Sequence, residues 1–262
     1  MTDAPEFETI RVTANGAVGE LWLARPTRLN ALSRTVLREV VLAARWLDEQ
    51  QELKIVVVGG EGRAFSAGFD LDDFTRPEPG VSPRETAELG RLAAEALTDV
   101  RALTIAAIQG HCVGGGLVLA AACDLRIAAD DARFSIPEVD LGIPLAWGGI
   151  PRLVRELGPA VTKELVLTCR PFGADEALAL RFVNRVVAAE DLTNEVASLA
   201  ASLAGKPGYA LRTTKQQVNA VMEEIAGTGR NAADADALAF AMSDPESRAA
   251  SLAYLSARRS ST

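Results

Sequence analysis

Apolar and polar residues alternate near the start of the chain and then change to a helical spacing. Residues 9–12 and 20–23 flank an Asn-Gly pair typical of hairpin turns, so we predict two antiparallel strands. Ser33 is a candidate N-cap for a helix whose apolar positions recur every three or four residues as far as residue 47. Residues 55–58 read Ile-Val-Val-Val before two glycines, which predicts a buried strand. Strand, helix and strand in this order form the unit of a parallel sheet.

The same order recurs further along the chain. Helical spacing returns at residues 84–100, after a proline-rich loop at residues 75–83 that we expect to be mobile. A strand at 103–109 follows, then a glycine turn, a buried helix at 115–121 and a strand at 125–128. Beyond residue 149 most of the pattern is helical, with helices predicted at 153–157, 160–167, 174–180, 192–204, 210–225 and 232–255.

This pattern predicts an α/β protein in two parts. Residues 1–195 contain all the predicted strands and form the expected core with its site. Residues 196–262 are predicted to be mostly helical and to serve packing or oligomerisation.

Composition and charge remove several classes of function. The 262 residues carry 35 acidic and 27 basic side chains, a net charge of −8, which disfavours binding to nucleic acid or to an anionic membrane. The chain has a single histidine, His111, so a metal site with two or more imidazole ligands is excluded and we expect no metal. Residues 104–123 lack charged side chains, but polar residues and three glycines interrupt them, so we predict a strand, a turn and a buried helix rather than a membrane span.

The cysteines and the first residues indicate the compartment. Three cysteines without a Cys-x-x-Cys pair are typical of reduced, packed thiols. The first eight residues are acidic and no apolar run follows a basic end, so we expect no signal peptide and a cytoplasmic protein.

Two glycine-containing turns, at residues 60–71 and 109–117, carry the candidate chemistry. Small residues let a ligand approach the backbone, and a helix that begins at such a turn directs free N–H groups at it. Neither turn fits Gly-x-Gly-x-x-Gly or a P-loop, so nucleotide phosphate binding by those motifs is disfavoured. From the residues alone, the glycines are equally consistent with tight strand-to-helix turns that bind nothing.

Five ordered motifs resemble those of the crotonase (enoyl-CoA hydratase/isomerase) superfamily. They lie at residues 25–32, 64–71, 110–116, 123–128 and 134–142, and the resemblance extends over roughly residues 8–190. The last residues, 256–262, lack the basic-Pro-x-aromatic ending of many relatives. The resemblance implies a crotonase-like spiral of ββα units with a C-terminal helical region, a homotrimer or hexamer, and an acyl-CoA thioester as substrate. It implies no separate cofactor, since coenzyme A is part of the substrate.

The resemblance also implies roles for particular residues. Ala67 and Gly115 would donate backbone N–H groups to the thioester oxygen and so stabilise an enolate. Glu138 matches the second of two glutamates in the family's hydratases, whereas Val118 stands where the first is expected. The residues implied to line the substrate site are Arg28, Leu29, Ala67, Gly68, Phe69, Asp70, Gly115, Val118 and Trp147.

Val118 decides between the reactions of the family, because valine neither accepts nor returns a proton. A single glutamate is sufficient for an isomerase, which takes a proton from C2 and returns it to C4. We therefore expect enoyl-CoA isomerisation in the catabolism of fatty or other carboxylic acids. The alternatives are a 2-enoyl-CoA hydratase in which Asp140 or a bound water compensates for Val118, and a non-catalytic acyl-CoA-binding protein.

The remaining polar and aromatic residues near the motifs have more than one reading. Asp70 is expected to cap the helix after the first turn rather than to act as a base. His111 is expected in the core or behind the second turn, and Ser66 is expected to be a small turn residue. Trp147 is expected either to narrow the acyl pocket or to be a packing residue. Three arginines, Arg25, Arg28 and Arg63, lie near the motifs of the coenzyme-binding edge and either attract an anionic ligand or are solvated.

Overall fold

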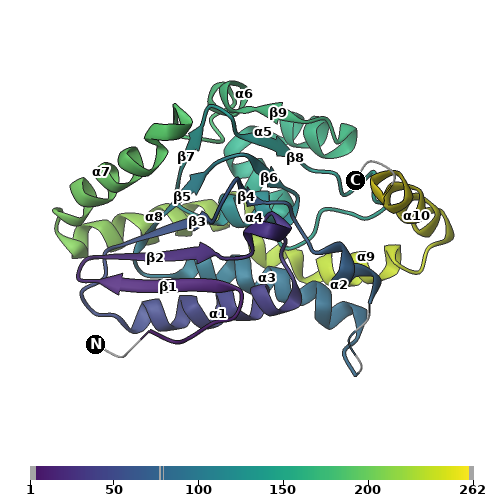
Figure 1. Cartoon of the computed structure of the whole chain (residues 1–262), viewed down its shortest axis with the longest axis horizontal. Coiled ribbons are helices and arrows are strands. Elements are labelled where there is room, and N and C mark those ends of the chain that lie inside the picture. Colours follow the sequence, from purple (N-terminus) through teal and green to yellow (C-terminus); the bar gives the residue numbers. More distant parts are fainter. Residues whose placement is uncertain (1–3, 77, 79, 260–262) are drawn as a thin grey trace.

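The computed structural model describes residues 4–76, 78 and 80–259 and contains two sheets (Figure 1). The six-stranded sheet has the order β1-β2-β3-β5-β7-β10 and is parallel except for the β1–β2 hairpin. Its strands are β1 (Ile10–Asn15), β2 (Val18–Leu23), β3 (Ile55–Gly60), β5 (Leu103–Ile108), β7 (Leu125–Ala129) and β10 (Arg185–Val187). The predicted hairpin and the buried strand at residues 55–58 are confirmed.

The four-stranded sheet, in the order β4-β6-β8-β9, gives the fold its spiral character. Its strands are β4 (Ala64–Ser66), β6 (His111–Val113), β8 (Arg133–Ser135) and β9 (Phe172–Gly173). Each of β3, β5 and β7 is followed by a short strand of this second sheet and then by helix, so the ββα unit occurs three times. The helices of these units are α2 (Leu71–Thr75) with α3 (Pro83–Asp99), α4 (Gly115–Ala122) and α5 (Gly149–Thr168). This arrangement confirms the predicted fold class.

Helix α1 (Arg34–Glu49) forms where the apolar spacing predicts it. The Ser33 hydroxyl accepts a hydrogen bond from the N–H of Val36 and caps the helix. The buried face of α1 packs against α3 and the β1–β2 hairpin, as Figure 1 shows below the sheet. Helix α4 is buried at every position, which accounts for its lack of charged residues.

The C-terminal helices differ from the prediction in one place. The predicted helix at 232–255 is instead a 3-10 segment (Thr228–Ala233), α9 (Asp234–Ala241) and α10 (Pro245–Arg259). Proline lacks the N–H that a continuing helix needs, so α10 starts at Pro245 and the Asp244 carboxylate accepts from the N–H of Ser247. The predicted helices at 153–157 and 160–167 join across a kink at Gly158 into α5.

The transition from sheet core to helical region also lies later than expected. Helix α7 (Leu192–Ala204) crosses residue 195 without interruption. Its residues Leu192, Val196 and Ala200 pack with β3, β5 and β7 in a second apolar cluster. The chain leaves the sheet only after α7 and continues as α8 (Gly208–Ala226), whereas α6 (Ala174–Ala179) and α7 still belong to the core.

Two further expectations concern the loop at residues 75–83 and a membrane span. The loop expected at residues 75–83 includes residues 77 and 79, which lie outside the described residues. Within the described part of the chain, no helix combines the length and apolarity needed to cross a membrane.

Candidate active site

The two glycine-containing turns meet at the start of α4. Gly68 has φ +87°, a conformation that favours glycine. A Cβ at this position would lie 2.8 Å from the Val113 carbonyl oxygen and 3.8 Å from the Gly115 nitrogen. The turn after β4 therefore packs directly against the turn after β6, and only a residue without a side chain permits this approach.

The first turn is held in place by a buried asparagine. Asn30 accepts from the N–H of Arg25 and donates to the carbonyl oxygens of Glu61 and Ala64. The buried Ser66 hydroxyl donates to the Asn30 carbonyl and accepts from the N–H of Gly68. Ser66 is thus a turn residue, as expected, and the network positions the backbone of the site.

One expected donor is corrected by these contacts. The N–H of Ala67 donates to the Leu29 carbonyl oxygen at 2.9 Å, so it is not free for a ligand. The N–H of Phe69, two residues later, has no acceptor among the described residues. The N–H of Gly115 has none either, because Gly115 is the first residue of α4 and lacks an intrahelical partner. Among the described residues, Phe69 and Gly115 therefore each offer a free N–H beside the cavity, one from each turn.

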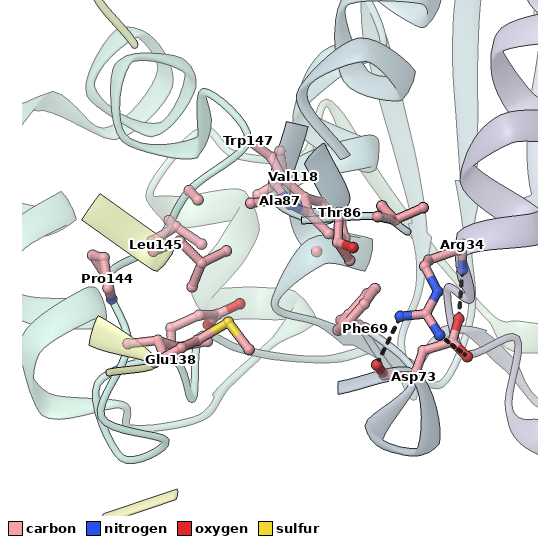
Figure 2. Close-up of a pocket in the computed structure, with 16 residues that line it drawn as sticks. Arg34, Phe69, Asp73, Thr86, Ala87, Val118, Glu138, Pro144, Leu145 and Trp147 are labelled. Carbon is pink, nitrogen blue, oxygen red and sulfur yellow. Dashed lines mark hydrogen bonds and ion pairs between the residues drawn. The ribbon is translucent and has the colours of Figure 1, made fainter. Parts of the chain in front are cut away.

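A mostly apolar cavity of about 210 Å³ adjoins these donors. In the close-up of Figure 2, Glu138 lies on one side of the cavity, the Arg34–Asp73 pair on the other, and Phe69, Val118 and Trp147 between them. A smaller cavity of about 60 Å³ shares Phe69 and Glu138 with it and is also lined by Ala67, Gly68 and Tyr254 of α10.

Glu138 has the most unusual environment of the carboxylates at the site. Its Oε2 is shielded from solvent and has no hydrogen-bond partner in the described structure, although the residue as a whole is half-buried. Its Oε1 packs so closely on Gly114 that a Cβ there would lie 2.4 Å away. Burial disfavours the charged form and raises the pKa of Glu138 to about 7. A carboxyl group with this pKa both accepts and donates a proton near neutral pH.

Asp73 is a second carboxylate at the main cavity, but its oxygens are paired. One oxygen accepts from the backbone N–H of Arg34 at 2.7 Å, and the other is 3.4 Å from the Arg34 guanidinium. Figure 2 shows these contacts as dashed lines, away from Glu138. The pair is consistent with a structural role between α1 and α2.

The structure separates the other expected residues into those that line the cavities and those that support them. Phe69, Gly115, Val118 and Trp147 line the main cavity, and Ala67 and Gly68 line the smaller one. Arg28, Leu29 and Asp70 line neither.

Asp70 caps α2, as expected, by accepting from the N–H of Asp72. Burial acts to raise the pKa of Asp70, but hydrogen bonds from Arg25 and from the Asp72 N–H, with the charges of Arg25 and Arg28, lower it overall. Arg25 and Arg28 are thus engaged with this carboxylate, whereas Arg63 is exposed. Leu29 contributes its carbonyl oxygen to the Ala67 N–H.

Two further residues weighed in the sequence analysis, Asp140 and His111, lie outside both cavities. Asp140 is exposed and lines neither cavity, so it does not supply a second carboxylate beside Glu138. His111 is exposed on β6 rather than buried in the core, and it lies outside both cavities.

The sequence motifs do not single out several of the lining residues. Ile143 and Leu145 follow Glu138 in a turn, and Leu238 and Met242 lie at the C-terminal end of α9. The spacing of four between Leu238 and Met242 places both on one helical face, but the same spacing is typical of ordinary packing. Only the fold of α9 against α3 brings them to the site.

The fold and site are of the crotonase class. The fold repeats ββα units, and the site combines free backbone amides at the start of a helix with a desolvated carboxyl group. The family model described as Enoyl-CoA hydratase/isomerase matches residues 13–261. A "Probable enoyl-CoA hydratase echA8" of Mycobacterium bovis is 38% identical over 227 residues, 85% of this chain and 86% of its own length. The "Crotonyl-CoA hydratase" of Syntrophomonas wolfei is 34% identical, with 91% and 92% covered.

Solved structures agree with this result. An enoyl-CoA hydratase/isomerase from Xanthobacter autotrophicus Py2 superposes with a TM-score of 0.84 at 27% identity, over 97% of this chain and 94% of that one. The chain belongs to the enoyl-CoA hydratase/isomerase family.

The raised pKa of Glu138 predicts a pH-dependent stability. Between about pH 4.5 and 7 the unfolded chain ionises this carboxyl while the folded protein keeps it protonated, so stability falls as pH rises through this range. Glu138→Gln removes this loss. As the pH rises from 5 to 8, the free energy of unfolding of the variant should increase by about 2–3 kcal/mol relative to that of the wild type.

Urea unfolding at several pH values measures this difference. Substitution of the exposed Glu190 by Gln serves as the control. A constant difference between wild type and Glu138→Gln from pH 5 to 8 would show that the carboxyl group is not desolvated.

Proposed function

We propose that this protein is an enoyl-CoA isomerase that shifts a 3-enoyl thioester to the 2-enoyl isomer with Glu138 as its one acid–base group. The observation that carries the proposal is the buried Oε2 of Glu138, which has no partner among the described residues, in a mostly apolar cavity that Val118 also lines. Val118 is fully buried on α4, one turn after Gly115, and offers no group that binds or activates water.

The reaction follows from these groups. The Glu138 carboxylate removes a proton from C2 of the 3-enoyl thioester, and the electron pair delocalises through the carbonyl as a dienolate. The N–H groups of Phe69 and Gly115 hold the developing oxyanion, aided by the positive end of the α4 dipole. The protonated Glu138 then returns the proton to C4, which leaves the double bond between C2 and C3. Atoms and charge balance without a cofactor beyond the coenzyme A of the substrate.

The names of the relatives favour a second candidate, hydration of 2-enoyl-CoA. Several relatives, including the two proteins compared above, are named hydratases. Hydration needs a water positioned and deprotonated at C3 and a proton delivered at C2. The position of Asp140 argues against the version in which it supplies the second carboxylate, so a hydratase here would depend on Glu138 and bound water alone.

Turnover in deuterated water distinguishes the candidates. With 3-hexenoyl-CoA we expect 2-hexenoyl-CoA to form without added hydroxyl and to carry deuterium at C2 and C4. Mass spectrometry and NMR detect the product and the position of the label. Glu138→Gln should lower the rate by about 10²- to 10⁴-fold, since it removes the proton carrier. Asp140→Asn is the matched control and should retain wild-type turnover.

Other outcomes contradict the proposal in different ways. Faster hydration of crotonyl-CoA than isomerisation of 3-hexenoyl-CoA would make the protein a hydratase. Tight binding of both thioesters with neither reaction nor exchange would make it an acyl-CoA-binding protein.

We also propose that the protein forms a homotrimer or a hexamer through α8. Val218, Val221 and Ile225 are 54%, 55% and 66% exposed and lie on one face of this helix. Tyr209, near its start, is 75% exposed. Apolar side chains that gather on one helical face are typical of a surface covered by another subunit. A cytoplasmic location, expected from the reduced cysteines, stays a prediction.

A charge on this face should disrupt the assembly. We expect wild-type protein to have the mass of three or six chains by light scattering and Val221→Asp to shift towards a monomer, because the charge would be buried unpaired. Gln216→Asp, on the opposite side of α8, should leave the mass unchanged. A monomeric wild type at micromolar concentration would contradict this proposal.

A further inference from the structure

Trp147 is held in a backbone conformation that few tryptophans adopt. Its φ is +61°, in the left-handed region, and the residue is buried. The guanidinium of Arg152, on α5, donates to the carbonyl oxygens of Trp147 and Gly148 at 3.3 and 3.1 Å. The N–H of Gly148 donates to the Asp234 carboxylate of α9 at 3.0 Å. Two helices thus fix the turn that carries the indole.

The indole occupies a slot between two glycines. A Cβ on Gly90, in the interior of α3, would lie 1.8 Å from the indole, and a Cβ on Gly115 would lie 2.2 Å from it. A glycine inside a helix lowers the stability of that helix. The close contact with the indole explains why glycine nevertheless stands at position 90. Any side chain at either glycine would displace the ring.

The slot places the indole beside the reacting end of the proposed substrate. The atoms of Trp147 nearest Gly115 belong to the six-membered ring, and Gly115 carries one of the two free donors. The Phe69 ring meets the indole edge-to-face, with centroids 5.8 Å apart and planes at 88°. Phe69 carries the other free N–H, so both rings lie at residues that offer a donor and would border a thioester carbonyl bound there.

The rest of the cavity wall comes from other elements. Leu238 and Met242 of α9 and Thr86 and Ala87 of α3 line the same cavity. Figure 2 shows Trp147 near Val118 and Ala87, apart from Arg34. The cavity of about 210 Å³ has room for an acyl chain, and the indole borders it at Gly115 and Phe69.

We propose that Trp147 is a specificity-determining residue that restricts the substrate to acyl groups unbranched at C2. This inference rests on the proposed function, because it takes the thioester carbonyl to lie at the N–H groups of Phe69 and Gly115. A methyl branch at C2 would meet the fixed indole, whereas a linear chain of the same composition would pass along it. In other enzymes, one methyl or methylene group more or less changes the preference between two substrates by about 10- to 200-fold.

Binding of saturated thioesters tests this without turnover. Butanoyl-CoA and 2-methylpropanoyl-CoA have the same composition and differ only in the branch, and isothermal titration gives their dissociation constants. We expect wild type to bind butanoyl-CoA at least about tenfold more tightly. Trp147→Ala should bring the two constants within about threefold, and Trp147→Phe should give an intermediate ratio.

A matched cavity variant and thermal unfolding complete the design. Leu238→Ala enlarges the same cavity where α9 lines it and should keep the wild-type ratio, because it leaves the indole in place. Trp147→Phe remains informative if Trp147→Ala fails to fold. Equal binding of both thioesters by wild type, or an unchanged ratio in a folded Trp147 variant, overturns the inference. If wild type binds neither thioester, the proposed function itself fails.

Discussion

The close approach of the turn at Gly68 to the start of α4 is the constraint on which the site depends. It brings two chain segments from different ββα units within van der Waals contact, and the N–H groups of Phe69 and Gly115 find no acceptor in the part of the chain that the structure describes. Buried backbone donors are almost always paired, so free ones beside a cavity indicate a ligand acceptor. The network around Asn30 and Ser66 secures this geometry before any substrate binds.

The same turns create the electrostatic character of Glu138. Gly114 lets the carboxyl group pack on the backbone, and the apolar surroundings withhold partners from its Oε2. The result is a group whose pKa of about 7 suits proton transfer in both directions. Val118, which carries no titratable group, lines the same cavity at the position where the family's hydratases are expected to have a glutamate, and this difference motivates the proposed isomerisation.

Much of the fold was predictable from the sequence, because apolar periodicity reports burial directly. The hairpin, α1, β3 and α4 lie where the spacing of their residues placed them. The break at Pro245 was missed because the apolar spacing continues on both sides of it, and the later transition after α7 depends on packing that spacing does not reveal. At the site, motif matching placed Glu138 and Gly115 at the cavity that they line. It chose Ala67 as the first donor, two residues before Phe69, since only the hydrogen bond from Ala67 to Leu29 shows which amide is occupied. The contribution of Leu238 depends on the contact of α9 with α3. The motifs indicated Trp147 at the substrate site, but its slot against Gly90 of α3 is a tertiary contact that no local pattern shows.

The central claim, that two converging amides polarise a thioester carbonyl, is most directly tested by isotope-edited infrared spectroscopy. Butanoyl-CoA labelled with ¹³C at C1 would be bound at saturation, and its carbonyl stretch compared with that of the free thioester. We predict a shift to lower frequency, because two hydrogen bonds in an apolar site weaken the C=O bond. A carbonyl band at the frequency of the free thioester, with the ligand fully bound, would contradict the account.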